Sequence, residues 1–324
     1  MELKRRFKQM QSGENIEMAA RYIKEGKLVA FPTETVYGLG ANALNPIAVA
    51  KIFELKQRPS FDPLIVHIAD RLDLIRLTKN LDERVIKIAE KFWPGPLTLI
   101  VPKNDIVPDI VTSGLPTVGI RMPDNDIALE LIRLSGCPIA APSANKFGRI
   151  SPTNAAHVRK NLPKVDYILE GGKSKVGIES TIISITDRGF RILRSGVITR
   201  EEIEAIVPYD SSVVDRKDVM APGMFASHYS PTKPMLIDDG INTPDIDKSK
   251  AGFISYSGAN TGGYRKVLRL TYAADLREYA ANLFEAMHLL EDSDVEIIVA
   301  EQVPETGLGI AIMDRLRKAA NVGK

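Results

Sequence analysis

The chain alternates short runs of β-branched residues with stretches of helical periodicity, and this alternation stops between Pro208 and Pro234, where Asp, Ser, Pro and Gly accumulate. Alternating strands and helices are typical of an α/β fold, and an aperiodic stretch of this composition is typical of a linker. A chain of 324 residues also exceeds what one hydrophobic core usually organises. We therefore predict a larger α/β domain over residues 10–207, a linker over 208–234 and a small Rossmann-like α/β domain over 235–324.

Short apolar runs predict the strands, and capping residues or proline at the first turn predict the helix starts. In the first domain we expect strands at 27–31, 64–68, 97–101, 118–122, 138–141, 167–169, 181–185 and 191–193, and helices over 46–58 and 82–93, after Asp124 and from Thr199. In the second domain we expect strands at 235–237, 251–256 and 296–300 and helices over 273–292 and 310–320.

The composition limits the class of protein. Hydrophobic residues make up 44% and charged residues 26% of the chain, which is typical of soluble globular proteins and excludes disordered and fibrous classes. No apolar run approaches the ~18 residues of a membrane span, and polar residues follow the basic start of the chain where a signal peptide would be apolar. A single cysteine, Cys137, fits a reducing compartment, so we expect a cytoplasmic protein without membrane contacts.

The charged and metal-ligating residues argue against two further classes. Lys and Arg total 43 against 41 Asp and Glu, and the net charge of +2 is too small for sequence-independent binding of nucleic acid. The four histidines and one cysteine lack metal-ligand spacing. We expect no metal site built from side chains, and any metal would be Mg²⁺ that enters with a nucleotide.

Short polar side chains gather where predicted strands end. Residues 31–41 place hydroxyls and two glycines after the first strand, and residues 141–145 and Ser151 repeat this pattern after a later one. Ligands of open α/β sheets bind at the carboxyl ends of the strands. These segments are therefore either ligand-binding loops or hydroxyl-rich tight turns.

Cations occur near the same edge of the predicted sheet. Lys56 and Arg58 end a helix before the strand that contains His67. Arg121 lies inside an apolar strand, where an unpaired guanidinium would be costly, so it needs an anionic partner. That partner is either a carboxylate of the protein or the carboxylate of a bound substrate.

Together these residues resemble the YrdC-like family over roughly Ile16 to Val207. The run Pro32–Leu39 is the family's most recognisable motif, and the linker with the second domain is similar to the family's longer, two-domain form. The other motifs follow in the family's order: Lys56-x-Arg58-Pro59, Pro63-Leu64, Trp93-Pro94-Gly95-Pro96-x-Thr98, Arg121-x-Pro123, Pro142-Ser143-Ala144-Asn145, Ser180-Thr181 and Arg194-x-Gly196.

The resemblance implies a twisted open mixed sheet with flanking helices and a positively charged cavity. It also implies a nucleotidyltransferase that forms L-threonylcarbamoyladenylate and pyrophosphate from L-threonine, bicarbonate and ATP. The product serves the threonylcarbamoyladenosine modification of tRNA, and tRNA is a partner only indirectly, through a downstream transferase complex.

The resemblance assigns roles residue by residue. Lys56, Arg58 and Arg121 would be catalytic by neutralising and positioning the substrates. The expected threonine contacts are Thr35, His67, Arg121, Ala141 and Thr181, although Ser180 and Thr181 point to opposite faces of a strand, so only one is expected to enter the cavity. The expected ATP contacts are Lys56, Arg58, Thr117, Ser143, Asn145, Ser151, Arg194 and Tyr229.

The linker is interpreted as an active-site lid in which His228 and Tyr229 help to exclude water. It departs from the family's pattern at Phe225, where tyrosine is usual, and at Ser227, where a basic residue is common. Two other functions stay open: a module that binds double-stranded RNA or tRNA without catalysis, and carbamoyl transfer in hydrogenase maturation. The latter occurs in longer chains with paired-cysteine zinc motifs, which one cysteine cannot supply.

Overall fold

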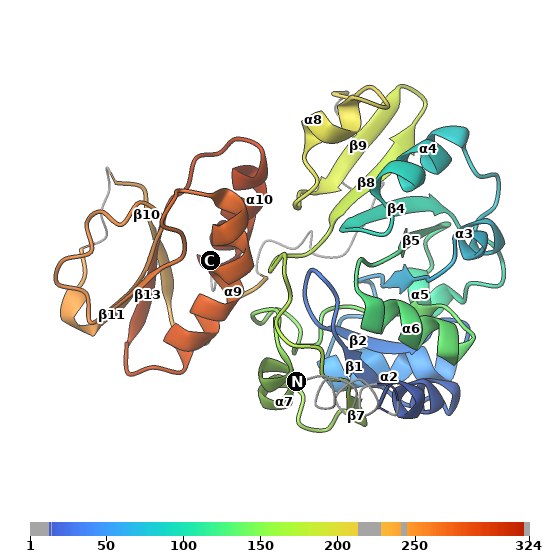
Figure 1. The fold of residues 1–324 in the computed structure, drawn as a ribbon, viewed down its shortest axis with the longest axis horizontal. Helices are drawn as coiled ribbons and strands as arrows, with labels where there is room; N and C mark the ends of the chain where they lie inside the picture. The colour runs from blue at the N-terminus through green and yellow to red at the C-terminus, as the bar shows by residue number, and fades with distance from the viewer. Residues whose placement is uncertain (1–12, 14, 213–227, 241–244, 321–324) are drawn as a thin grey trace, which may run out of the picture.

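The computed structural model describes residues 13, 15–212, 228–240 and 245–320, which form two α/β domains (Figure 1). The strands of the first are β1 (Val29–Phe31), β2 (Gly38–Asn42), β3 (Ile65–His67), β4 (Leu97–Pro102), β5 (Thr117–Arg121), β6 (Ile139–Ala140), β7 (Tyr167–Ile168), β8 (Thr181–Thr186) and β9 (Gly189–Arg194). Its helices are α2 (Pro46–Lys56), α3 (Arg71–Leu77), α4 (Glu83–Phe92), α5 (Asp109–Thr112), α6 (Asp126–Ser135), α7 (Ala155–Asn161) and α8 (Arg200–Glu204).

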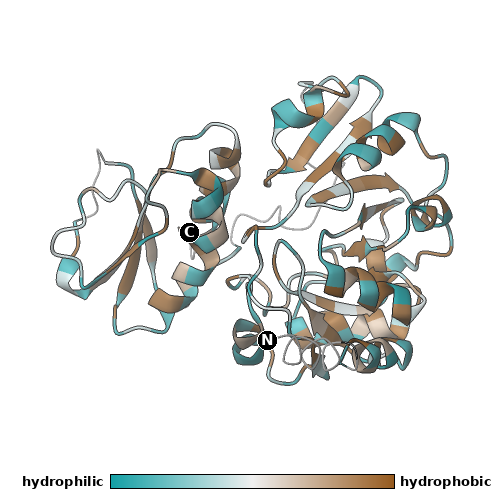
Figure 2. Cartoon of the chain, in the orientation of Figure 1, coloured by the Kyte–Doolittle hydropathy of each residue, from teal (hydrophilic) through white to brown (hydrophobic). Residues whose placement is uncertain are grey.

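Within the described residues these strands form one nine-stranded sheet in the order β7-β1-β2-β6-β3-β5-β4-β8-β9. The sheet is mixed: β1 pairs with β7, β3 with β5 and β4 with β8 in parallel, whereas the other neighbours are antiparallel. Figure 2 shows hydrophobic residues concentrated on the strands. The predicted open mixed sheet with flanking helices is confirmed.

The second domain is a four-stranded parallel sheet with two long helices. Its strands are β10 (Met235–Asp238), β11 (Ala251–Ser255), β12 (Lys266–Arg269) and β13 (Ile297–Glu301), in the order β10-β13-β11-β12, and its long helices are α9 (Leu276–Glu291) and α10 (Leu308–Ala320). Both helices lie on the side of the small sheet that faces the first domain (Figure 1). The predicted smaller α/β domain is confirmed.

Local sequence signals explain several helix ends. The Asn45 side chain accepts hydrogen bonds from the backbone N–H groups of Ile47 and Ala48, and Pro46 occupies the first turn of α2. Thr199 and Glu202 form the predicted capping box of α8.

The prediction for residues 31–41 was wrong in one respect. We expected a loop after the first strand, but Gly38–Asn42 is β2, which returns antiparallel to β1 as a hairpin. A Cβ atom at Gly40 would lie 2.8 Å from both Phe31 and Ile139. The strand therefore needs glycine for close packing, and it lacks the β-branched residues by which strands are recognised. The elements α3, α5, α7 and β12 were also not predicted.

The predicted linker is only partly described. Its first residues pack on the first domain. Tyr209 forms an isolated parallel β-bridge with Phe190, and the Asp210 carboxylate accepts hydrogen bonds from Thr186 and Arg191, each at 2.8 Å. Residues 213–227, including the expected departures at Phe225 and Ser227, lie outside the described residues.

Polar and aromatic contacts hold the two domains together beside α7 and α9. The ring of His288 stacks on that of His157 with centroids 3.8 Å apart, and His288 Nε2 lies 3.2 Å from the carbonyl oxygen of Ser151. The Glu285 carboxylate accepts a hydrogen bond from the Asn154 amide at 3.1 Å. The interface therefore reaches Ser151, a residue of the predicted site.

Gly177 lies against the backbone of α9, so we expect a side chain at this position to destabilise the protein. Gly177 has φ +78°, and a Cβ there would lie 2.4 Å from the carbonyl oxygen of Ala280 on α9, whereas Gly172 has φ +76° and open space around it. Gly172→Ala should cost about 1–2 kcal/mol because of its left-handed backbone. Gly177→Ala should cost an additional ~1–3 kcal/mol because α9 must move. Urea unfolding of both variants measures the difference, and equal losses would contradict the close docking of α9.

Candidate active site

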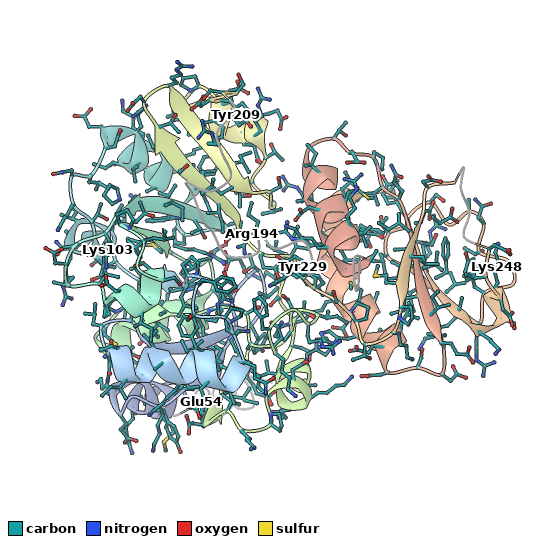
Figure 3. All side chains as sticks on the ribbon, turned by 180° about the vertical axis from the view of Figure 1, so that it is seen from behind. Glu54, Lys103, Arg194, Tyr209, Tyr229 and Lys248 are labelled. Carbon is teal, nitrogen blue, oxygen red and sulfur yellow. The ribbon has the colours of Figure 1, made fainter. Side chains whose placement is uncertain are left out.

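One cavity lies where the first domain meets the segment that leads to the second. Its empty space is about 570 Å³, part of it open to solvent. Figure 3 labels Arg194 and Tyr229, two of its lining residues, near the boundary between the domains. The lining residues are Thr33, Thr35, Val36, Gly38, Arg58, Pro63, Ile65, His67, Arg121, Ala141, Pro142, Ser143, Glu179, Arg194, His228 and Tyr229.

The turn between β1 and β2 explains the hydroxyl-rich motif. The Thr33 hydroxyl donates a hydrogen bond to the carbonyl oxygen of Val36 at 2.6 Å and accepts bonds from the backbone N–H groups of Thr35 and Val36, each at 3.2 Å. The hydroxyls of Thr33 and Thr35 are 2.9 Å apart. This network fixes a buried turn, so the segment is both a tight turn and part of a cavity wall.

Arg121 pairs with a protein carboxylate in this wall. Its NH2 atom lies 2.6 Å from Glu34 Oε1, and both side chains are at most 5% exposed. The guanidinium still has capacity, since its Nε has no hydrogen-bond partner among the described residues. Of the two partners that the sequence left open, the protein carboxylate is therefore present, and the Nε–H group of Arg121 can donate to a second anion.

His67 lies beside Arg121 and is uncharged at neutral pH. The two residues are register partners at the ends of β3 and β5. Burial lowers the pKa of His67 to about 3, and the positive charge of Arg121 contributes to the same shift. The ring can thus accept or donate a hydrogen bond without adding charge.

Two basic side chains at the end of α2 have different environments. The Arg58 guanidinium lines the cavity, pairs with Asp62 at 2.8 Å and donates to the carbonyl oxygen of Pro63 at 2.8 Å. Lys56 is not among the lining residues; its Nζ donates to the carbonyl oxygens of Ser143, at 2.6 Å, and Asn145. Burial holds the pKa of Lys56 well below its usual value. Lys56 therefore supports the loop that carries Ser143.

Arg194 lines the cavity at the end of β9 and is oriented by Ser180. Its Nε donates to the Ser180 carbonyl oxygen and its NH2 to the Ser180 hydroxyl, each at 3.0 Å. The Thr181 hydroxyl instead donates to the carbonyl oxygen of Ile198 at 2.7 Å. Neither Ser180 nor Thr181 is among the residues that line the cavity. Both hydroxyls instead form hydrogen bonds within the protein.

Eight of the predicted site residues line this cavity and five do not. The eight are Thr35, Arg58, His67, Arg121, Ala141, Ser143, Arg194 and Tyr229, and the five are Lys56, Thr117, Asn145, Ser151 and Thr181. Thr117 borders a separate small cavity at the start of β5. Ser151 reaches the main cavity indirectly, because its hydroxyl donates to Glu179 Oε1 at 2.5 Å.

Sequence reasoning assigned no role to Thr33 and Glu179, which also line the cavity, as does His228, which it placed in the lid. Glu179 directly precedes the Ser180-Thr181 motif, but no sequence signal shows that its carboxylate faces a cation-rich cavity.

His228 and Tyr229 form the cavity wall nearest the second domain. Tyr229 is fully buried, has φ 62° and stacks on Phe284 of α9 with centroids 5.5 Å apart. Burial raises the pKa of its hydroxyl, whereas burial and the nearby Arg58 hold the pKa of His228 well below its usual value. The Tyr229 hydroxyl and His228 Nδ1 have no hydrogen-bond partner within the described part of the chain. Since buried polar atoms are nearly always hydrogen-bonded, these atoms indicate a cavity suited to a polar ligand.

Two families match consecutive parts of the sequence. The family Sua5_yciO_yrdC, described as "Telomere recombination", matches residues 21–196, and the family described as "Threonylcarbamoyl-AMP synthase, C-terminal domain" matches residues 198–321. The chain belongs to the Sua5/YciO/YrdC family. The predicted resemblance is confirmed, and the second match places this member among the two-domain forms.

Relatives of this family member match it over almost its whole length. It is 45% identical to the threonylcarbamoyl-AMP synthase of Pyrococcus abyssi, over 94% of each chain. It is 44% identical to the enzyme of the same name from Bacillus subtilis, over 94% of this chain and 92% of the relative. The crystal structure of P. abyssi Sua5 complexed with L-threonine superposes with a TM-score of 0.84 at 43% identity, over 94% of each chain.

The described residues contain neither a metal-ligating cluster nor a membrane-spanning helix. No three or more His, Cys, Asp or Glu side chains gather there in an arrangement that could hold a metal ion. Among the helices described, none combines the length and the apolar character needed to cross a membrane.

The neutral state of His67 gives a pH-dependent prediction. Its pKa is about 3 in the folded protein against 6.5 for the ordinary side chain, so the unfolded chain binds more protons between these values. The free energy of unfolding should therefore fall as the pH drops below 6.5, by about 1.4 kcal/mol per pH unit for this group. His67→Gln should remove that part of the slope in urea unfolding between pH 7 and pH 5. An unchanged slope would mean that His67 is protonated in the folded state.

Proposed function

We propose that this protein is a threonylcarbamoyl-AMP synthase, which forms threonylcarbamoyl-AMP and pyrophosphate from L-threonine, bicarbonate and ATP. The observation that carries the proposal is the convergence of Arg58, Arg121 and Arg194 on one cavity. Three guanidiniums suit a ligand set with a carboxylate and a triphosphate. The relatives that match almost the full length carry the same activity in their names.

The threonine subsite is proposed at the β1–β2 turn and the ends of β3 and β5. Arg121, whose Nε has no hydrogen-bond partner in the described part of the chain, would bind the carboxylate, and Thr35, His67 and Ala141 complete that wall. His67 would accept or donate a hydrogen bond as a neutral ring. Because the Thr181 hydroxyl already binds a backbone oxygen, our proposal gives it a supporting role at the start of β8.

The ATP subsite is proposed on the part of the cavity lined by Arg58, Ser143, Arg194 and Tyr229. Fixed guanidiniums in a water-poor site stabilise the charge that develops on the phosphates more strongly than they would in water. The other expected ATP contacts would act indirectly. Lys56 and Asn145 would support the loop that carries Ser143, and Ser151 would orient Glu179. Thr117 would act from the separate small cavity at the start of β5. We propose that Mg²⁺ arrives with the nucleotide, since it prefers phosphate oxygens and retained waters.

The chemistry requires positioning more than a protein nucleophile. The threonine amine forms a carbamate with bicarbonate and releases water; a carbamate oxygen then attacks the α-phosphorus, and pyrophosphate leaves with the electrons of the broken P–O bond. Holding three reactants in one geometry removes much of the entropic barrier. A carbamate is unstable in water, so the buried His228 and Tyr229 would protect it by excluding solvent.

The cellular setting belongs to the same proposal. The product is an activated precursor, and a downstream transferase complex would pass its threonylcarbamoyl group to tRNA. We place the reaction in the cytoplasm, with no direct role for tRNA in this chain.

Pyrophosphate release tests the function. Release should require ATP, threonine and bicarbonate together. Arg121→Ala should lower kcat/KM for threonine by about 30-fold or more, because truncating one partner of a buried charge pair costs about 2–5 kcal/mol. Arg121→Lys keeps the charge but not the planar fork and should have an intermediate effect. Arg133→Ala, on the exposed face of α6 with a side chain 55% exposed, is the control.

Two results would overturn the proposal. Release that ignores threonine would leave a nucleotide-binding protein with another substrate. Salt-dependent RNA affinity without threonine-dependent release would instead favour the RNA-binding module.

A further inference from the structure

The second domain sends one fully buried arginine into the first. Arg315 on α10 is 0% exposed. Its Nε donates to Glu179 Oε2 at 3.2 Å, and its NH1 donates to the carbonyl oxygen of Ser195 at 2.6 Å and to the carboxylate of Asp314 at 3.0 Å. Burial of a guanidinium is costly unless its donors are satisfied, so this arrangement is a built contact between the domains.

Arg315 contacts Glu179 and Ser195 in the first domain and Tyr229 in the linker, and these residues lie in or next to the cavity wall described above. Glu179 and Tyr229 line the cavity, and the Arg315 guanidinium carbon lies 5.4 Å from the centroid of the Tyr229 ring. Ser195 follows Arg194, whose guanidinium also lines the cavity. Arg315 therefore touches the part of the cavity wall around Arg194 and Tyr229 through a carboxylate, a backbone carbonyl and an aromatic ring.

Two segments of this wall are packed backbone against backbone. A Cβ at Gly196 would lie 2.3 Å from the backbone nitrogen of Thr181 and 2.8 Å from the carbonyl oxygen of Glu179. Arg315 donates to both segments, through Ser195 on one and Glu179 on the other. A shift of Arg315 would therefore displace the segment at Glu179 and the segment at Ser195, and Arg194 would move with the latter.

The contact between Arg315 and Glu179 also changes the net charge of the cavity wall. Glu179 is the one carboxylate among the described residues that line this cavity, and it is only 7% exposed. An uncompensated negative charge there would repel a polyphosphate in a medium that screens poorly. Arg315 binds one oxygen of Glu179, and the Ser151 hydroxyl binds the other.

We propose that Arg315 is a positioning residue for the nucleotide subsite: it neutralises Glu179 and fixes Ser195 and Tyr229, so that the cavity accepts ATP. The second domain thus acts directly on the reaction. This inference rests on the proposed function for its assignment of that wall to ATP.

The test is Arg315→Met in the full chain. The KM for ATP should rise about tenfold or more, because a like charge then faces the triphosphate, while the KM for threonine stays within about twofold. A loss of folded protein would lower kcat without this split, and thermal unfolding measures that loss separately. Arg317→Ala is the matched control, since Arg317 lies on the same helix, pairs with Glu305 and has a side chain 51% exposed.

A double variant distinguishes neutralisation of Glu179 from mechanical support of the cavity wall alone. Adding Glu179→Gln to Arg315→Met removes the unpaired charge and should return the KM for ATP to within about threefold of the wild type. Arg315→Lys, which keeps the charge but lacks the fork that reaches two partners, should raise that KM by about threefold. It is the variant to use if Arg315→Met does not fold.

An ATP KM within twofold of the wild type in either folded Arg315 variant would overturn the inference, as would a double variant no better than Arg315→Met. Calorimetric titration with ATP separates this from failure of the proposed function. If the wild type shows no threonine-dependent release, about tenfold weaker ATP binding by Arg315→Met still supports the role of Arg315, and equal binding rejects it.

Discussion

The cost of burying guanidinium groups governs this structure. A cavity for anionic substrates needs arginines inside the protein, yet desolvation disfavours each of them. Burial lowers the pKa of Arg58 and Arg194. In this fold every arginine that lines the cavity has a fixed partner. Carboxylates or carbonyl and hydroxyl oxygens serve in the pairs Arg58–Asp62, Arg121–Glu34 and Arg194–Ser180.

These partners come from different parts of the sheet, which explains why the fold matters for the site. Glu34 lies in the turn between β1 and β2, and Arg121 ends β5, which lies three positions from β2 in the sheet order. Lys56 ties the end of α2 to the loop after β6. The mixed sheet thus sets the spacing of the charges, and its loops need little freedom to assemble a precise site.

The sequence predicted the elements whose signals are local. Asn45, Pro46 and the Thr199 capping box marked helix starts correctly, and β-branched runs marked most strands. Strand β2 was missed because its glycines serve packing against Phe31 and Ile139, which is a tertiary requirement. In the same way, Arg121 could be recognised as needing an anion, but its pairing with Glu34 depends on a turn that spacing does not reveal. The position of Lys56 behind the Ser143 loop is likewise a product of long-range packing.

Arg315 and Glu179 are separated by 136 residues in the chain. During synthesis the first domain emerges well before α10, so the cavity wall at Glu179 is completed only after residue 315 has left the ribosome. In a nascent or prematurely terminated chain, Glu179 therefore lacks this cation. With the role proposed for Arg315, the contact makes completion of the second domain a condition for a finished nucleotide subsite, and it links catalytic competence to full-length translation.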